Sequence, residues 1–293
     1  MAGRRRLVPV LLFVLMAVTA CAPLVVPPGP QRGMPVVEIA GPAGVLRARD
    51  GAELPLRAWR PDGAPRAVVL ALHGFNDYGN FVAAPAARLT ARGLAVYAYD
   101  QRGFGAAPHR GRWPGVDALT GDLGDAVAAL RRRHPGLPLY LLGESMGAAV
   151  VMTAMTGPAP PRVEGIILSA PAVWGRRTMS GLQRRLLWLM AHTLPWLPLS
   201  GGDLGIQASD NIEMLRALGR DPLIIRETRV DAIWGLTNLM DAALAAAPAG
   251  PDPVRREGRG DPPGADAGDD PRPRSRAWPA PGDLSRRLAH AAA

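Results

Sequence analysis

The stretch LYLLGESMGAAV, from Leu139 to Val150, determines the fold that we expect for this chain. An apolar run enters the pattern Gly-x-Ser-x-Gly, and small residues suited to a helix follow it. A serine at such a strand-to-helix turn sits in a strained backbone that exposes its hydroxyl group. Gly143 and Gly147 are needed because a side chain at either position would collide with the neighbouring strand or helix. Ser145 is therefore predicted to be a nucleophile at the start of a helix, where developing negative charge is favoured.

Strand patterns and helix patterns alternate on both sides of this turn. Continuous apolar runs, typical of strands covered on both faces, end at the turn and recur on either side of it. These runs are 67–72, 94–99, 137–142 and 163–169. Helical spacing is present at 81–92, 117–133 and 148–155. Shorter strand patterns at 36–39, 45–49 and 54–59 come first, with Asp50-Gly51 as a hairpin turn. The order predicts an α/β fold with a doubly wound, mostly parallel sheet.

The later part of the chain has a different pattern. A segment at about 172–230 is apolar, rich in tryptophan and interrupted by prolines, so we expect a helical cap without strands. A helix is predicted at 231–247, which completes one α/β domain at 36–249. Residues 250–293 are dominated by Pro, Gly, Arg, Asp and Ala without periodicity, and they are predicted to be a disordered tail.

The N-terminus resembles a bacterial lipoprotein signal. Residues 1–21 combine three arginines, a short apolar run and small residues before Cys21, the expected lipidation site. The alternative is an ordinary signal peptide with an incidental cysteine. Residues 22–35 are rich in Pro and Gly and suit a tether. Because Ala22 and not Asp follows Cys21, we expect the bacterial cell envelope as the location, with the chain anchored by lipid on the periplasmic face of the outer membrane.

Composition excludes several functional classes. The formal net charge is +9, but every basic residue is arginine and the chain is rich in Ala, Gly and Pro. GC-rich coding DNA explains the preference for Arg, Ala, Gly and Pro. Because no basic cluster is interleaved with aromatic residues, nucleic acid is not an expected partner. A single cysteine excludes an internal disulfide and a multi-cysteine metal site. No phosphate loop or ligand cluster predicts a cofactor or a metal.

Three motifs in this order resemble the α/β-hydrolases of the monoacylglycerol lipase, lysophospholipase and serine aminopeptidase S33 group. The motifs are His73-Gly74-Phe75, Asp100-x-Arg102-Gly103-x-Gly105 and Gly143-Glu144-Ser145-Met146-Gly147. The resemblance implies that Ser145 attacks an ester carbonyl and that the backbone N–H groups of Phe75 and Met146 hold the oxyanion. His73 precedes the serine, whereas this fold places its catalytic histidine last, so we expect a structural role for it. Asp100 and Arg102 are expected to organise loops.

A nucleophilic serine also needs a base and an acid. The family order places both beyond residue 249, where no strand pattern remains. His290 is the only histidine late enough, and the late carboxylates follow no strand. A frameshift near residue 250 would explain why the strand, acid and histidine are missing. In the shifted frame, codons compatible with Gly250–Pro263 can encode VLILYGGRDEVIPP, a strand followed by a turn and an acid. Codons compatible with Ser285–Ala292 can encode PDGWHMLL, which resembles the family's segment around its catalytic histidine. A true alternative tail is the competing interpretation. With the frame as written, the triad acid and base are unknown and little activity is expected.

Three functions remain open. The first is a serine hydrolase of carboxylic esters, with monoacylglycerols or lysophospholipids as lipid-like substrates that suit an apolar cap. The second is a non-catalytic envelope lipoprotein that keeps the hydrolase shell. The third is a serine peptidase, although the cap has no acidic cluster to receive a peptide amine.

Overall fold

The computed structural model describes residues 22–200, 213, 216 and 218–246. The chain forms two compact units, Met1–Leu244 and Ala245–Ala293. Of the second unit only Ala245 and Ala246 are described, as the end of a helix. The expected features at Cys21 and beyond residue 249 lie outside the described residues.

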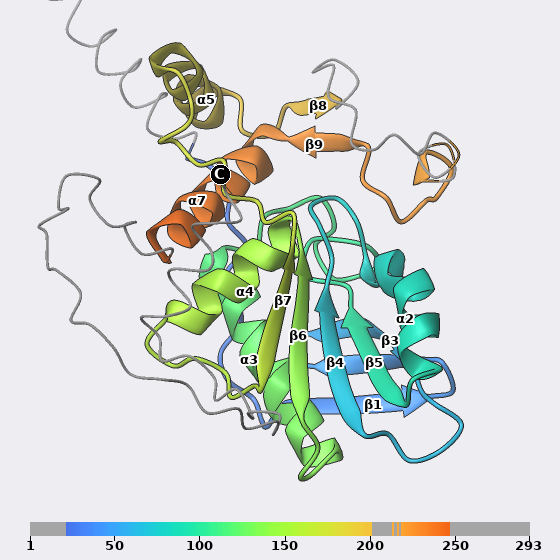
Figure 1. The fold of residues 1–293 in the computed structure, drawn as a ribbon. Helices are drawn as coiled ribbons and strands as arrows, with labels where there is room; N and C mark the ends of the chain where they lie inside the picture. Colours follow the sequence, from blue (N-terminus) through green and yellow to red (C-terminus); the bar gives the residue numbers. More distant parts are fainter. Residues whose placement is uncertain (1–21, 201–212, 214–215, 217, 247–293) are drawn as a thin grey trace, which may run out of the picture. The chain divides into compact units, whose positions relative to one another are not determined.

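The described part of the chain contains a seven-stranded sheet in the order β1-β2-β3-β5-β4-β6-β7 (Figure 1). The strands are β1 Val36–Ala40, β2 Ala43–Arg47, β3 Glu53–Trp59, β4 Ala67–Leu72, β5 Leu94–Tyr99, β6 Leu139–Glu144 and β7 Gly165–Ser169. β1, β2, β3 and β5 pair antiparallel, whereas β5, β4, β6 and β7 pair parallel. The predicted α/β fold with a mostly parallel sheet is confirmed.

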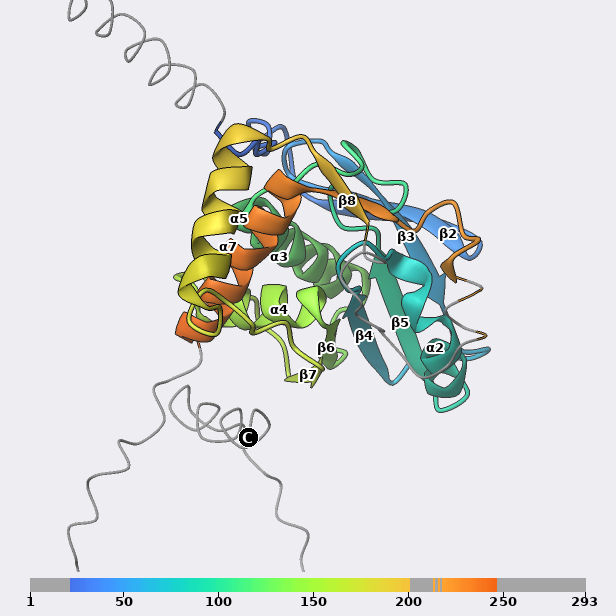
Figure 2. The ribbon, with the colours of Figure 1, turned by 90° about the horizontal axis from the view of Figure 1, so that it is seen from above.

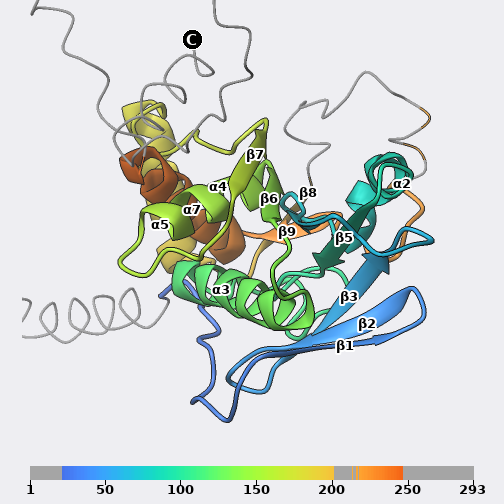
Figure 3. The ribbon, with the colours of Figure 1, turned by 60° about the horizontal axis from the view of Figure 1, so that its bottom comes forward.

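Helices cover both faces of this sheet, as continuous apolar strands require. All six residues of β4 are buried, and so are five of the six in β5. Figure 3 shows α2 on one face and α3 and α4 on the other. The helices are α2 Ala83–Thr90, α3 Val116–Arg133 and α4 Met146–Thr156. A 3₁₀ turn at Gly79–Val82 replaces the start of the helix predicted at 81–92.

β7 is the last strand of the described sheet, and its environment differs from that of β4. Ile167 is 52% exposed. Among the residues that the structure describes, no strand pairs with the outer edge of β7. An apolar strand with one open edge is typical of a sheet that continues with a further strand.

The cap contains α5 Gly181–Thr193 and two short strands, and α7 Val230–Ala246 follows it at the position of the helix predicted at 231–247. β8 Pro198–Ser200 and β9 Glu227–Arg229 pair antiparallel. The expectation of a cap without strands is therefore wrong. Three-residue strands are too short to show an alternating pattern, and their partners lie far apart in the chain. No helix in the described part of the chain has the length and hydropathy needed to cross a membrane.

Candidate active site

Ser145 lies between the end of β6 and the start of α4, as predicted. Its backbone is in the left-handed region, with φ 50° and ψ −112°. Such a conformation costs a non-glycine residue about 1–3 kcal/mol and persists only where its surroundings fix it. Here the Ser145 N–H donates to the Ser169 carbonyl at 2.9 Å, and the Ser145 carbonyl accepts from the Ala172 N–H at 3.0 Å. The end of β7 thus holds the strained turn in place.

The two glycines of the motif are required by close backbone contacts. A Cβ atom on Gly147 would overlap the carbonyl group of Leu72, at the end of β4. A Cβ atom on Gly143 would lie 2.6 Å from the Cα atom of Ala148. Both collisions involve backbone atoms, which cannot move aside as a side chain can. The structure therefore supports the collision argument made from the sequence.

The loop after β4 passes close to this turn. A Cβ atom on Gly74 would lie 3.5 Å from the Cβ atom of Ser145. Among the described residues, no hydrogen bond uses the N–H of Phe75 or of Met146, the two expected oxyanion donors. The ring of Phe75 is fixed edge-on against Phe104, with centroids 5.5 Å apart. Two amides without a described partner beside the half-buried Ser145 suit an oxyanion site.

The same loop is tied to the segment that precedes α7. The Asn76 carbonyl accepts from the Ile225 N–H at 3.0 Å, and the Asn76 side-chain amide donates to Thr228 Oγ1 at 2.7 Å. The Tyr78 hydroxyl donates to Asp221 Oδ2 at 2.6 Å. Burial, followed by this carboxylate, raises the pKa of Tyr78 to about 12. We did not predict these contacts, because nothing local in the sequence links residues about 150 positions apart.

His73 has a structural role in the loop. Its ring is buried, with Nδ1 2.7 Å from the Gly74 carbonyl and Nε2 accepting from the Gln101 N–H at 2.9 Å. These partners suit a neutral ring that carries its proton on Nδ1. Burial lowers the pKa of His73 to about 4. Both ring nitrogens are occupied, so His73 is not placed to accept the proton of Ser145.

No other described histidine is hydrogen-bonded to Ser145. His134 bonds to the Tyr97 hydroxyl and precedes β6, whereas Ser145 follows that strand about 20 Å away at 3.3 Å per residue. His192 is part of α5 and bonds to the Trp188 carbonyl. His290 lies outside the described residues, as do the late carboxylates. Within its described part, the structure forms the turn at Ser145 without a histidine hydrogen-bonded to it.

Asp100 organises the loops beside this turn. It accepts hydrogen bonds from the N–H groups of Gly79 and Ala106, both at 2.9 Å, and pairs with Arg57 at 2.6 Å. These bonds join the loop after β4 to the loop after β5. The structure therefore supports the loop-organising role expected for Asp100.

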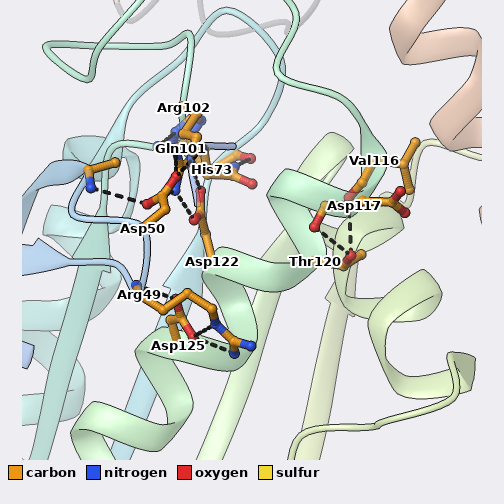
Figure 4. A network of polar contacts seen from close by, with 12 residues as sticks. Arg49, Asp50, His73, Gln101, Arg102, Val116, Asp117, Thr120, Asp122 and Asp125 are labelled. Atoms are coloured by element: carbon orange, nitrogen blue, oxygen red, sulfur yellow. Dashed lines mark hydrogen bonds and ion pairs between the residues drawn. The ribbon is translucent and has the colours of Figure 1, made fainter. Parts of the chain in front are cut away.

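Arg102 forms a second, separate network (Figure 4). It donates two hydrogen bonds to Asp50 and two to Asp122, all between 2.7 and 2.8 Å. Burial alone would raise the pKa of Asp50, but hydrogen bonds from Arg102 and from backbone N–H groups lower it to about 2. For Asp122 burial dominates and raises the pKa to about 6. The sequence signal that we missed is a pair of aspartates, Asp122 and Asp125, on the apolar face of α3.

Comparison with known proteins agrees with this architecture. A family model described as "Serine aminopeptidase, S33" matches residues 63–254. The monoacylglycerol lipase of Mycolicibacterium smegmatis is 29% identical over 175 residues, which cover 59% of this chain and 62% of that protein. Human monoglyceride lipase is 30% identical over 183 residues, covering 60% of this chain and 58% of that protein. The chain thus spans about three fifths of the length of these relatives.

Solved structures show the same fold. The monoacylglycerol lipase of Paleococcus ferrophilus superposes with a TM-score of 0.53 at 22% identity, over 67% of this chain and 73% of that one. A soluble variant of the Saccharomyces cerevisiae monoglyceride lipase superposes with a TM-score of 0.52 at 23% identity, over 73% of this chain and 71% of that one. With the matched family model and the sheet order, these likenesses lead to one conclusion. The chain belongs to the serine aminopeptidase S33 family and is a monoacylglycerol lipase-like α/β-hydrolase.

Proposed function

We propose that the chain is built as a serine hydrolase of carboxylic esters, with Ser145 as the nucleophile. The observation that carries this proposal is the left-handed backbone of Ser145 at the end of β6. A non-glycine residue is held in that conformation only where the surrounding structure imposes it, and glycines packed against backbone on both sides do so here. Relatives named as monoacylglycerol and monoglyceride lipases favour a single-chain lipid ester, such as a monoacylglycerol or lysophospholipid, as the substrate.

The proposed reaction follows from these positions. Ser145 Oγ attacks the ester carbonyl while its proton passes to a base, and the carbonyl oxygen becomes an oxyanion. The N–H groups of Phe75 and Met146 stabilise that charge, together with the amino end of α4. When the intermediate collapses, the leaving oxygen takes the proton back from the base and departs as the alcohol, which leaves an acyl group on Ser145. Water then attacks the acyl group, releases the carboxylic acid and restores the serine hydroxyl.

In the described part of the chain, no histidine is hydrogen-bonded to Ser145. We propose that the segment beyond about residue 249 should supply the base and the acid, and that the chain as written has very little activity. Loss of a triad member in serine hydrolases reduces turnover by about 10⁴- to 10⁶-fold. The open edge of β7 supports this proposal, because further strands would join the sheet there.

A non-catalytic role is the second candidate, favoured by the lack of a hydrogen bond between Ser145 and any described histidine.

In either case we propose attachment to the bacterial cell envelope through a lipid on Cys21. Radiolabelled palmitate incorporation, with Cys21→Ser as the control, tests that attachment directly. Equal labelling of the two chains would contradict it.

The nucleotide sequence across codons 245–260 tests the frame. If one insertion or deletion restores a strand and an aspartate, the restored chain should hydrolyse p-nitrophenyl acyl esters. Ser145→Ala in that chain should lower the rate by about 10⁴-fold or more. Unchanged hydrolysis in Ser145→Ala would exclude the proposed nucleophile, and faster cleavage of aminoacyl amides than of esters would favour a peptidase.

A further inference from the structure

A pocket of about 820 Å³ lies at the end of the sheet opposite Ser145. It is formed by the turn between β1 and β2, the end of β3 with the loop before β4, two residues of β5 and the end of α3. The loop before β4 and the end of α3 precede parallel strands, so they lie at the amino ends of those strands. Figures 1 and 2 show α7 and β8 at the other end, where β6 finishes and Ser145 follows. The pocket is therefore separate from the candidate active site.

Two arginines and a histidine give this pocket a basic lining. Arg60 directly follows β3, Arg133 ends α3, and His134 comes next. None of the lining residues is Asp or Glu, and Asp62, in the same loop, is not among them. Within the described part of the chain, Arg60 and Arg133 form no ion pair, and Arg60 donates one hydrogen bond to the Gly41 carbonyl at 3.1 Å. An anion in the pocket would thus meet two cations without a competing carboxylate in the wall.

The two arginines act on the same point of the pocket wall. Tyr97, on β5, is completely buried, and its hydroxyl lies 2.7 Å from His134 Nε2. Burial raises the pKa of Tyr97, whereas the positive charges of Arg133 and Arg60 oppose this rise. Burial and the charge of Arg133 also lower the pKa of His134. Both guanidinium groups therefore lie near the Tyr97 hydroxyl, although they come from distant parts of the chain.

His134 adds a third donor to the pocket. The Tyr97 hydroxyl bonds to no other acceptor among the residues that the structure describes, so we assign its proton to the bond with His134 Nε2. The neutral ring then carries its own proton on Nδ1, and that N–H has no hydrogen-bond partner in the described part of the chain. The wall thus offers the N–H groups of two guanidiniums and one imidazole. The carboxyl end of α3 adds only about half a negative charge, which the two guanidiniums outweigh.

We propose that this pocket binds the phosphate group of a small organic phosphate monoester. Guanidiniums bind phosphate oxygens through paired hydrogen bonds, and a monoester has three free oxygens for the three donor groups. Its second pKa is about 6, so at pH 7.5 it carries nearly two negative charges to match Arg60 and Arg133. The rest of the lining is largely proline and alanine, which suits an apolar body. The volume is in the range of small-molecule sites, about 300–1,000 Å³, and exceeds what a free phosphate ion needs. The proposal is independent of the role of Ser145.

Isothermal titration calorimetry of the full chain at pH 7.5 tests the proposal, with phenyl phosphate as the ligand. Inorganic phosphate and benzoate are the comparison ligands, because the first lacks the apolar body and the second lacks the phosphate group. We expect phenyl phosphate to bind with a dissociation constant of about 1 mM or lower, and both comparison ligands to bind more weakly. Benzoate binding as tight as that of phenyl phosphate would overturn the assignment of a phosphate group. Inorganic phosphate binding as tightly would overturn the assignment of an organic body.

Variants of the lining show whether the phosphate binds in this pocket. Arg60→Gln and Arg133→Gln should each weaken the binding of phenyl phosphate about tenfold, because each removes a charge-assisted donor. His134→Phe should weaken it about fivefold, because a neutral donor is lost and an aromatic ring is kept. The matched control, Arg88→Gln with Arg92→Gln, removes the same charge on and just after α2, outside the pocket. It should bind as tightly as the wild type.

Equal affinity of the wild type and the Arg60→Gln, Arg133→Gln double variant would overturn the proposal. So would a lack of saturable binding of phenyl phosphate to the wild type at roughly tenfold the expected dissociation constant. Both arginines are exposed, so we expect these variants to fold, and far-UV circular dichroism checks this. If the double variant is unfolded, the two single variants and the comparison of the three ligands on the wild type decide the question.

Discussion

Replacing Arg102 with alanine should destabilise the fold strongly. The Arg102 side chain is 12% exposed, and those of Asp50 and Asp122 are each 4% exposed. Its four hydrogen bonds join the turn between β2 and β3 to α3 through the loop that follows β5 (Figure 4). Without Arg102, two buried carboxylates remain with no cation between them. Removing one partner of a buried ion pair costs about 3–5 kcal/mol, so we expect the free energy of unfolding to fall by an amount in that range at pH 7.5.

The control is Arg47→Ala, which removes ion pairs with Glu38 and Glu53 at an exposed site. Exposed pairs contribute about 0–1 kcal/mol, so this variant should stay close to the wild type. Urea unfolding followed by circular dichroism gives both free energies. The cost of Arg102→Ala should shrink at pH 5, because the carboxyl groups of Asp50 and Asp122 can then bind protons in the folded state.

Adding Asp50→Asn and Asp122→Asn to the Arg102→Ala variant should recover part of the loss at pH 7.5. A loss below 1 kcal/mol in Arg102→Ala, or one equal to that of Arg47→Ala, would refute the reasoning. A loss that does not change between pH 7.5 and pH 5 would show that buried charge is not its cause.

Three further predictions concern single positions. Folding lowers the pKa of His73 from 6.5 to about 4. The free energy of unfolding of the wild type, measured relative to that of a His73→Asn variant, should therefore fall by about 3 kcal/mol as the pH falls from 6.5 to 4. A difference between the two chains that does not vary with pH would contradict this. Gly147→Ala should cost about 1–3 kcal/mol or more in urea unfolding, whereas Gly121→Ala, in open space on α3, should stabilise by about 1 kcal/mol; equal effects would exclude the collision argument. Ile167→Lys on the open edge of β7 should reduce light scattering on heating more than Met34→Lys does, and the reverse order would show that this edge does not drive association.

The elements that follow from local patterns were predictable from the sequence. β4 and β5 match their predicted bounds, because a run of six consecutive apolar residues is typical of a strand covered on both faces. α3 begins one residue before the predicted start, at Val116. The turn at Ser145 was also predictable, since its glycines and its serine are adjacent in the chain.

Long-range contacts were not predictable in this way. Arg102 was expected to organise loops, but its partners lie 52 and 20 residues away. The bond between Asn76 and Thr228 spans 152 residues, and β8 and β9 contribute three residues each to their pairing. Such contacts depend on how the chain folds back on itself, and no local periodicity encodes them.

The rate at which a fluorophosphonate adds to Ser145 in the purified chain tests the central claim most directly. The turn presents the hydroxyl group, but no described histidine bonds to it, and we propose that the chain as written lacks the base and the acid. We therefore predict that intact-protein mass spectrometry will show addition slower by about 10⁴-fold or more than in the chain with its frame restored. Prompt, stoichiometric addition at Ser145 in the chain as written, abolished by Ser145→Ala, would contradict the account.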